Sequence, residues 1–139
     1  MHGFKGDRVL MRIHIGERDR FNGKPLHQEI VELLRQRGYA GATVFRGIMG
    51  FGASSRVHRA RLLGLSLDLP LVIECVDTDE KIKAVLPDLD NMIEGGMITL
   101  ERAKVIMYRP HRTEEEGPDD WSMDVTGSWK VASPEPPRE

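Results

Sequence analysis

The chain has few cysteines, few aromatic side chains and no long apolar run. Its one cysteine, Cys75, excludes an intrachain disulfide. No apolar segment approaches the roughly eighteen residues of a membrane helix, and no secretory signal is recognisable at the start. We therefore expect a protein of the reducing cytoplasm. With 139 residues and 40% hydrophobic content, it suits one compact domain.

Carboxylates are missing between Glu32 and Asp68, a stretch that holds six arginines and one histidine. Within it, residues 46–56 (RGIMGFGASSR) place three glycines between two arginines. Glycine lets a backbone approach a ligand closely, and the arginine fork matches phosphate oxygens. The pattern therefore predicts an anion cradle. Its candidate ligand-binding residues here are Arg46, Gly47, Gly50, Gly52, Ser54, Arg56 and His58.

We expect different tasks for these residues. Arg46 would contact a phosphate, and backbone N–H groups near Gly50 and Gly52 would complete the cradle. Arg56 and His58 would close over the ligand from the loop. A plainer interpretation stays open for each: the glycines form a tight bend, and the cations are solvated. A glycine series outside the GxxxxGK[ST] or GxGxxG context is weak support for phosphate binding.

The charge is divided unevenly along the chain. Residues 113–139 hold eight acidic and two basic side chains, whereas residues 1–112 hold eighteen basic and fourteen acidic ones. We expect one domain at residues 1–110 and an acidic, proline-containing, largely flexible tail at residues 111–139. The modest positive charge of the domain argues against nucleic-acid binding and favours a small anion.

The apolar pattern predicts an α+β fold. Strands are expected at residues 8–15, 42–46, 71–76 and 102–108, and helices at residues 25–37 and after a capping box formed by Asp77 and Glu80. Gly38 would stop the first helix, and Gly95 and Gly96 the second. This order is the ferredoxin-like βαββαβ plan, with a four-stranded antiparallel sheet and two helices on one face. A long loop at about residues 48–69 joins the second and third strands.

The sheet face without helices is expected to be too apolar to remain solvated, which favours self-assembly. The residues assigned to it are Leu10, Thr43, Phe45, Val72, Ile106 and Tyr108, with Arg12, His14, Glu74 and Lys104 among them. The other interpretation is that the C-terminal tail covers this face.

Catalytic patterns are weak in this chain. Ser54 and Ser55 precede His58, but the segment lacks the GxSxG form and a nearby carboxylate to orient the histidine. The histidines and Cys75 are isolated from one another in sequence, so we expect no metal site and no catalytic residues.

Three spaced motifs carry a resemblance to a known family. They are residues 43–52 (TVFRGIMGFG), residues 65–70 (LSLDLP) and residues 73–77 (IECVD). Over about residues 8–108 the chain resembles the PII-like family catalogued as domain of unknown function 190, which is similar to the nitrogen-regulatory PII proteins. Gly50 and Gly52 match the PII glycines at the base of the long loop. Arg109 matches a basic residue near the end of the last strand.

The resemblance implies a trimeric signalling protein. It would bind an adenine nucleotide as an effector in clefts between subunits and dock through its long loop on a target, with a membrane transporter as one candidate. Met107 replaces a companion arginine, and residues 95–99 replace a longer phosphate loop. These departures favour a small anion or a nucleotide with few phosphates. The alternatives are a ligand-free scaffold trimer and, third, a small enzyme acting on a phosphorylated metabolite.

Overall fold

The computed structural model describes residues 6–52, 58–59, 68–111, 121–123 and 129–131. Contacts divide the chain into a body, Arg8–Ala103, and a second unit made of Met1–Asp7 and Lys104–Glu139. In the second unit, β9 (Trp121–Met123) pairs antiparallel with β10 (Trp129–Val131). Most of the expected flexible tail lies outside the described residues, and the domain boundary at residue 110 stays a prediction.

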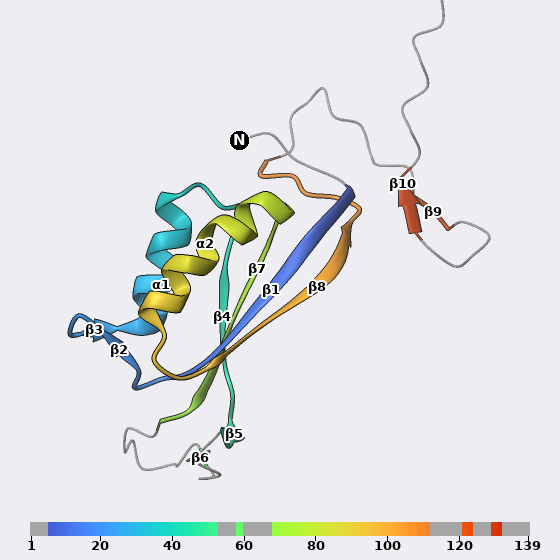
Figure 1. Cartoon of the computed structure of the whole chain (residues 1–139). Coiled ribbons are helices and arrows are strands. Elements are labelled where there is room, and N and C mark those ends of the chain that lie inside the picture. The colour runs from blue at the N-terminus through green and yellow to red at the C-terminus, as the bar shows by residue number, and fades with distance from the viewer. Residues whose placement is uncertain (1–5, 53–57, 60–67, 112–120, 124–128, 132–139) are drawn as a thin grey trace, which may run out of the picture. The chain divides into compact units, whose positions relative to one another are not determined.

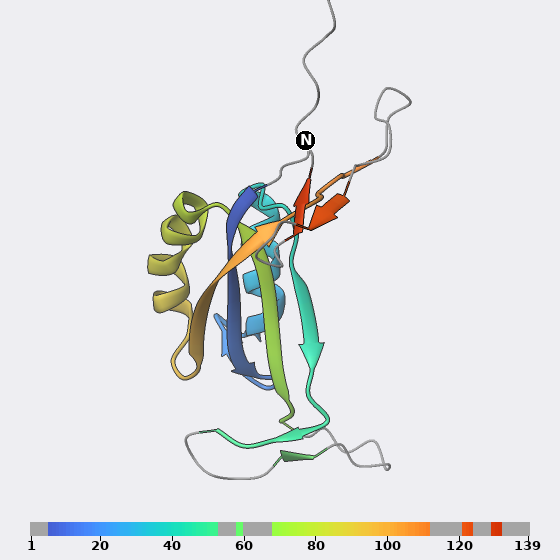
Figure 2. The same cartoon turned by 90° about the vertical axis from the view of Figure 1, so that its right-hand side faces the viewer.

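The body carries a four-stranded sheet with the strand order β4-β7-β1-β8. The strands are β1 (Gly6–Gly16), β4 (Thr43–Arg46), β7 (Pro70–Asp77) and β8 (Met97–Val105). Strand β7 pairs antiparallel with both β1 and β4. Both helices, α1 (Leu26–Gln36) and α2 (Asp79–Met92), lie on one face of the sheet (Figures 1 and 2). The expected ferredoxin-like fold is confirmed.

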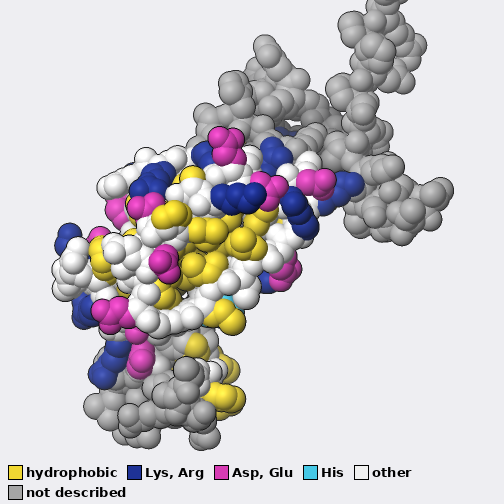
Figure 3. All heavy atoms as spheres, viewed as in Figure 1, with side chains coloured by type: hydrophobic (Ala, Val, Ile, Leu, Met, Phe, Trp, Pro, Cys, Tyr) yellow, Lys and Arg dark blue, Asp and Glu magenta, His cyan; other side chains and the backbone are white. Residues whose placement is uncertain are grey.

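The core lies between the helices and the sheet, because alternate strand residues point towards the helices. Met11, Ile13 and Ile73 are fully buried there, beneath Ile30 of α1 and Val85 of α2. Half-buried apolar side chains pack against this core from its margin, among them Leu86 of α2 and Ile98 of β8. Figure 3, viewed as in Figure 1, shows hydrophobic side chains gathered in the middle of the surface that faces the viewer and bordered by charged ones.

The helix ends follow local chemistry. Gly38, with φ 74°, follows α1 in the left-handed conformation that glycine adopts without strain. At the start of α2 the cap is Thr78, whose side chain accepts a hydrogen bond from the Lys81 N–H at 3.2 Å. The expectation that Asp77 caps this helix was wrong by one residue. Asp77 is the last residue of β7, and its carboxylate has a different task.

Asp77 ties two backbone segments together from a buried position. Its side chain is 4% exposed, and its two oxygens accept hydrogen bonds from the N–H groups of Ala40 at 3.0 Å and Thr78 at 2.8 Å. Burial and the neighbouring Asp77 also raise the pKa of the Cys75 thiol to about 12, so this thiol is protonated. The carboxylate thus joins the approach to β4 with the start of α2.

Replacing Asp77 with alanine is expected to lower the free energy of unfolding by about 2–3 kcal/mol. The change removes two charge-assisted acceptors from a buried position, and such bonds contribute roughly 1.5–3 kcal/mol each before relaxation. Urea denaturation measures the loss. The exposed Asp90 of α2 provides the control, since Asp90→Ala should change stability by less than about 0.5 kcal/mol. Equal stability of both variants would show that the Asp77 bonds contribute nothing.

The sheet face without helices carries a mixture of apolar and paired charged side chains. Arg12 lies opposite Glu74, and Val72 lies between His14 and Phe45 in the register of β1, β7 and β4. The Arg12 Nε donates to Glu74 at 3.0 Å, and its guanidinium also pairs with Glu101 of β8. These two hydrogen bonds raise the pKa of Arg12. The expected mixed face is therefore present at these positions.

The last strand begins earlier than the sequence predicted. Strand β8 starts at Met97, directly after Gly95 and Gly96, rather than at residue 102. Because Glu101 contacts Arg12, the odd-numbered residues of β8 face the same side as Arg12. Lys104, Ile106 and Tyr108 belong to the second unit, so their assignment to this face stays a prediction.

Candidate ligand-binding pocket at the base of the long loop

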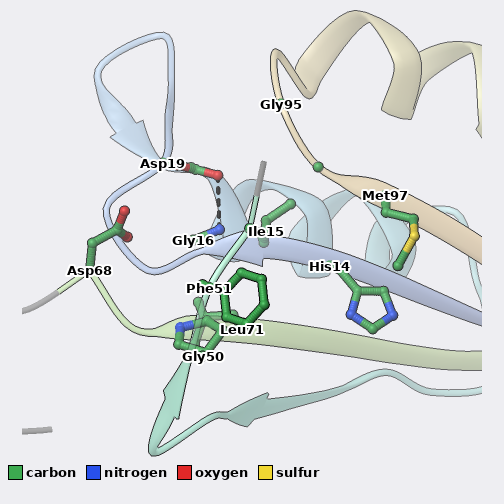
Figure 4. A pocket seen from close by; sticks show the side chains of 13 residues that line it. His14, Ile15, Gly16, Asp19, Gly50, Phe51, Asp68, Leu71, Gly95 and Met97 are labelled. Atoms are coloured by element: carbon green, nitrogen blue, oxygen red, sulfur yellow. Dashed lines mark hydrogen bonds between the residues drawn. The ribbon is translucent and has the colours of Figure 1, made fainter. Parts of the chain in front are cut away.

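A pocket of about 610 Å³ opens where both ends of the long loop meet the end of β1 (Figure 4). We call it the loop-base pocket. Segments far apart in the sequence line it, namely the end of β1 with the turn after it, the start and end of the long loop, and the turn before β8. The lining residues are His14, Ile15, Gly16, Asp19, Gly50, Phe51, Gly52, Asp68, Pro70, Leu71, Gly95, Gly96 and Met97.

The start of the long loop is held against its end. Within the loop, β5 (Met49–Gly50) pairs antiparallel with β6 (His58–Arg59), so that the loop begins as a narrow ribbon. The Gly47 N–H donates to the Pro70 carbonyl at 2.7 Å. A Cβ at Gly47 would lie 2.6 Å from the Pro70 ring, and one at Gly50 would lie 3.1 Å from it. A side chain at Gly47 would therefore force Pro70 or the loop to shift, whereas one at Gly50 would make a tight contact with the Pro70 ring.

The turn before β8 is held just as closely. A Cβ at Gly96 would lie 2.5 Å from the backbone oxygen of His14, so this glycine lets the turn pack directly on β1. The neighbouring Gly95 has nothing within 4 Å of its Cβ position, and the same is true of Gly52 across the pocket. Gly95 and Gly52 thus leave open volume in the lining, whereas Gly96 fixes the position of the turn.

Two carboxylates surround Gly16 at the end of β1. The Asp19 Oδ2 accepts the Gly16 N–H at 2.9 Å, and the Asp68 Oδ1 accepts the Arg18 N–H at 2.9 Å. A Cβ at Gly16 would lie 2.7 Å from the Asp68 carboxylate and 3.2 Å from that of Asp19. Only glycine fits here without displacing them. The lining that the structure describes therefore carries two carboxylates and no Lys or Arg. Any such cation that contacts a ligand would have to come from residues around the lining.

The other part of the lining is apolar. Phe51, Leu71 and Met97 supply apolar side chains to the lining, and Figure 4 shows His14 and Met97 further than Phe51 from the two aspartates. Phe51 is 71% exposed and Met97 is 54% exposed, so both have surface available to a ligand. The pocket consequently has an acidic end and an apolar end.

The candidate site residues from the sequence are distributed unevenly around this pocket. Gly50 and Gly52 line it, while Gly47 packs on Pro70 beside it. Arg46, which is not in the lining, forms an ion pair with Glu17 at 2.5 Å. Glu17 directly follows Gly16, so this pair lies at the margin of the pocket.

The structure relates none of the remaining candidate side chains to this pocket. Ser54 and Arg56 lie outside the described residues, and His58 is described only through its backbone pairing with Gly50. Arg109 belongs to the second unit. Sequence reasoning missed Asp19 and Asp68 as site residues, although Asp68 marked the end of the acid-free stretch, and it treated Gly95 and Gly96 as a shortened replacement for a phosphate loop.

These observations define a ferredoxin-like α+β protein with a ligand-sized pocket at the base of a long loop. The model of the DUF190 family, described as "Uncharacterized ACR", matches residues 8–105. The chain belongs to this family. The matched range contains every residue that lines the loop-base pocket.

Curated relatives agree with this assignment. A UPF0166 protein of Aquifex aeolicus is 40% identical over 97 residues, which cover 70% of this chain and 91% of the relative. A UPF0166 protein of Methanocaldococcus jannaschii is 38% identical over 92 residues, covering 66% of this chain and 84% of the relative. A second Aquifex aeolicus protein is 34% identical over 97 residues, covering 70% and 95%.

Metal sites and membrane-spanning helices are absent from the part of the chain that the structure describes. No cluster of three or more His, Cys, Asp or Glu side chains suitable for a metal ion occurs among these residues. Neither described helix has the length and apolarity needed to span a membrane.

Proposed function

We propose that this protein is a PII-like regulatory protein that binds an adenine nucleotide in the loop-base pocket. The observation that carries the proposal is the meeting of two glycine segments in one pocket. Gly50 and Gly52 start the long loop, and Gly95 and Gly96 precede β8. Gly50 and Gly52 match the loop-base glycines in the PII resemblance, whereas Gly95 and Gly96 stand in place of its longer phosphate loop, about forty residues further along the sequence.

The geometry supports control of the loop by the ligand. The loop-base pocket is lined by Gly50 and Phe51 at one end of the loop and by Asp68 and Pro70 at the other. A molecule in the pocket would touch both ends and so favour one arrangement of the loop, provided that it binds the arrangements with different affinity. We propose that the loop in turn docks on a target protein in the cytoplasm, with a membrane transporter as one candidate.

The charges support a particular orientation of the nucleotide. The carboxylates of Asp19 and Asp68 would repel the phosphates, which would then point towards the arginines of the long loop. Arg46 at the pocket margin would then exchange its Glu17 partner for a phosphate, which accepts a bidentate hydrogen bond from arginine. We propose reversible binding of an effector, without turnover and without a resident cofactor.

A thermal-shift screen tests the proposed function. AMP, ADP and ATP would each be added at about a hundred times the dissociation constant, where a ligand selective for the folded state stabilises it by about 2.7 kcal/mol. For a domain of this size that corresponds to a rise in Tm of several degrees. At least one of the three is expected to produce this rise. Unchanged Tm with all of them would favour the ligand-free scaffold.

We also propose that the protein forms a homotrimer through the open sheet face. Phe45 is 51% exposed on this face although it is a large aromatic side chain, and it lies beside Val72 in the register. Exposed apolar surface of this kind is usually covered by a partner. The ion pairs of Arg12 with Glu74 and Glu101 satisfy charges that would otherwise oppose burial.

The variant Phe45→Asp is expected to dissociate the trimer, because it buries an unpaired carboxylate at each interface at a cost of about several kcal/mol. Light scattering gives the mass. Leu100→Asp serves as the control: Leu100 is 47% exposed, and strand alternation places it on the opposite side of β8 from Glu101. A monomeric wild type at micromolar concentration, or a trimer that survives Phe45→Asp, would contradict this proposal.

A further inference from the structure

Asp19 and Asp68 each use one carboxylate oxygen for the fold and leave the other available. The Asp19 Oδ2 and the Asp68 Oδ1 accept the backbone N–H groups of Gly16 and Arg18. The Asp19 Oδ1 and the Asp68 Oδ2 accept no hydrogen bond from the residues that the structure describes. The backbone bonds fix both side chains, so the two available oxygens are held in place before any ligand arrives.

These two available oxygens face a common space. Each lies 3.2 Å from the position that a Cβ of Gly16 would occupy, and they are therefore within about 6 Å of each other. Since residue 16 has no side chain, the space between them stays open. Figure 4 shows the Asp19 and Asp68 side chains on either side of Gly16. Two neighbouring acceptors of this kind are suited to a ligand that presents two neighbouring donors.

The apolar end of the loop-base pocket limits which ligand fits. Phe51 and Met97 offer exposed surface at that end, and an aromatic base can stack on such a ring. Carboxylates accept hydrogen bonds from hydroxyl groups, and an aspartate or glutamate commonly reads ribose hydroxyls in nucleotide sites. The pocket thus joins a surface for a base to a pair of acceptors for a sugar.

We propose that Asp19 and Asp68 form a subsite for the 2′- and 3′-hydroxyl groups of a ribonucleotide, with the base against Phe51 and Met97. This inference rests on the proposed function and adds specificity to it. The pocket selects ribose over deoxyribose, because a deoxy sugar leaves one carboxylate oxygen without a donor. Both aspartates act as specificity-determining residues.

The test combines changes in the protein with changes in the ligand. Calorimetry in the presence of EDTA measures the affinity of AMP, 2′-deoxy-AMP and 3′-deoxy-AMP for the wild type, Asp19→Asn and Asp68→Asn. Asparagine can still accept the backbone N–H through its oxygen, while its amide nitrogen replaces the available acceptor. Asp90→Asn, on the exposed surface of α2, is the matched control.

The expected result is coupling between each carboxylate and the sugar. Wild type and Asp90→Asn should bind AMP about ten- to a hundredfold more tightly than either deoxy analogue, the range of a charge-assisted hydrogen bond. In Asp19→Asn and Asp68→Asn this preference should fall by about tenfold or more for at least one analogue. The variant already lacks the carboxylate acceptor, so removing the hydroxyl donor from the ligand costs little more. Unchanged Tm without ligand would confirm that the variants fold.

Four results would overturn the inference, and they are distinguishable. Equal wild-type affinity for AMP and both deoxy analogues would remove the ribose subsite while leaving nucleotide binding intact. Binding that disappears in EDTA and returns with Mg²⁺, or that tightens in the asparagine variants, would show that the carboxylates hold a cation or merely repel phosphate. If the wild type binds no adenine nucleotide, with EDTA or with Mg²⁺, the proposed function fails together with the inference.

Discussion

Gly96→Ala is expected to lower the free energy of unfolding by about 2–3 kcal/mol, near the upper end for adding a methyl group to a packed site. The new Cβ would lie 2.5 Å from the backbone oxygen of His14 and 3.2 Å from the Ile93 side chain. Because a backbone oxygen within β1 cannot move away as a flexible side chain can, the turn itself must shift. Urea denaturation provides the measurement.

Gly95→Ala is the matched control from the adjacent position. Its Cβ position has nothing within 4 Å, and its φ lies outside the left-handed range that only glycine favours. The substitution should leave stability unchanged or raise it by up to about 1 kcal/mol, because alanine restricts the unfolded chain. If Gly95→Ala destabilised the protein as much as Gly96→Ala, close packing of the turn on β1 would not be the cause.

Gly95→Val and Gly52→Val should each weaken adenine-nucleotide binding by about a hundredfold or more while the protein remains folded. Both glycines line the loop-base pocket and have open space at the Cβ position, so a larger side chain enters volume that a ligand would use. Losing contacts worth about 3 kcal/mol corresponds to roughly two decades in affinity. The nucleotide-induced rise in Tm should accordingly disappear in both variants.

Gly41→Val controls for the substitution itself. Gly41 also has nothing within 4 Å of its Cβ position, but it precedes β4 and is not part of the pocket lining. This variant should keep the full nucleotide-induced rise in Tm. Full retention of the response in Gly95→Val and Gly52→Val would place nucleotide binding elsewhere on the molecule.

Local patterns sufficed to predict most of the fold. The alternation of Val9, Met11 and Ile13 identified β1, and Gly38 marked the end of α1. The short hairpin formed by β2 (Arg20–Phe21) and β3 (Lys24–Pro25) was overlooked. Its turn, Asn22 and Gly23 with φ values of 50° and 76°, carries the Asn-Gly signal that favours such hairpins.

The start of β8 was harder to predict because apolar side chains occur on both of its faces. Ile98 packs against the core, while Met97 and Leu100 remain exposed. A regular alternation is therefore absent until later in the strand, and the predicted start fell at residue 102. Which side chains face Arg12 depends on the pairing of β1 with β8, which the sequence of β8 does not reveal.

The glycines of the candidate site were predictable, whereas its acids were not. Gly50 and Gly52 form a local motif. Asp19 and Asp68 come together only because Gly16 of β1 lies opposite Pro70 of β7. A long-range register of this kind has no local signature, so sequence reasoning predicted an anion cradle and missed the two carboxylates that line the pocket.

Calorimetric titration of the wild-type protein with AMP, ADP and ATP tests the central claim most directly. We predict saturable heat for at least one of these nucleotides, with one site per chain, and loss of that heat in Gly95→Val but not in Gly41→Val. Saturable binding that Gly95→Val leaves intact would contradict the assignment to the loop-base pocket. The absence of binding by all three nucleotides would contradict the proposed function itself.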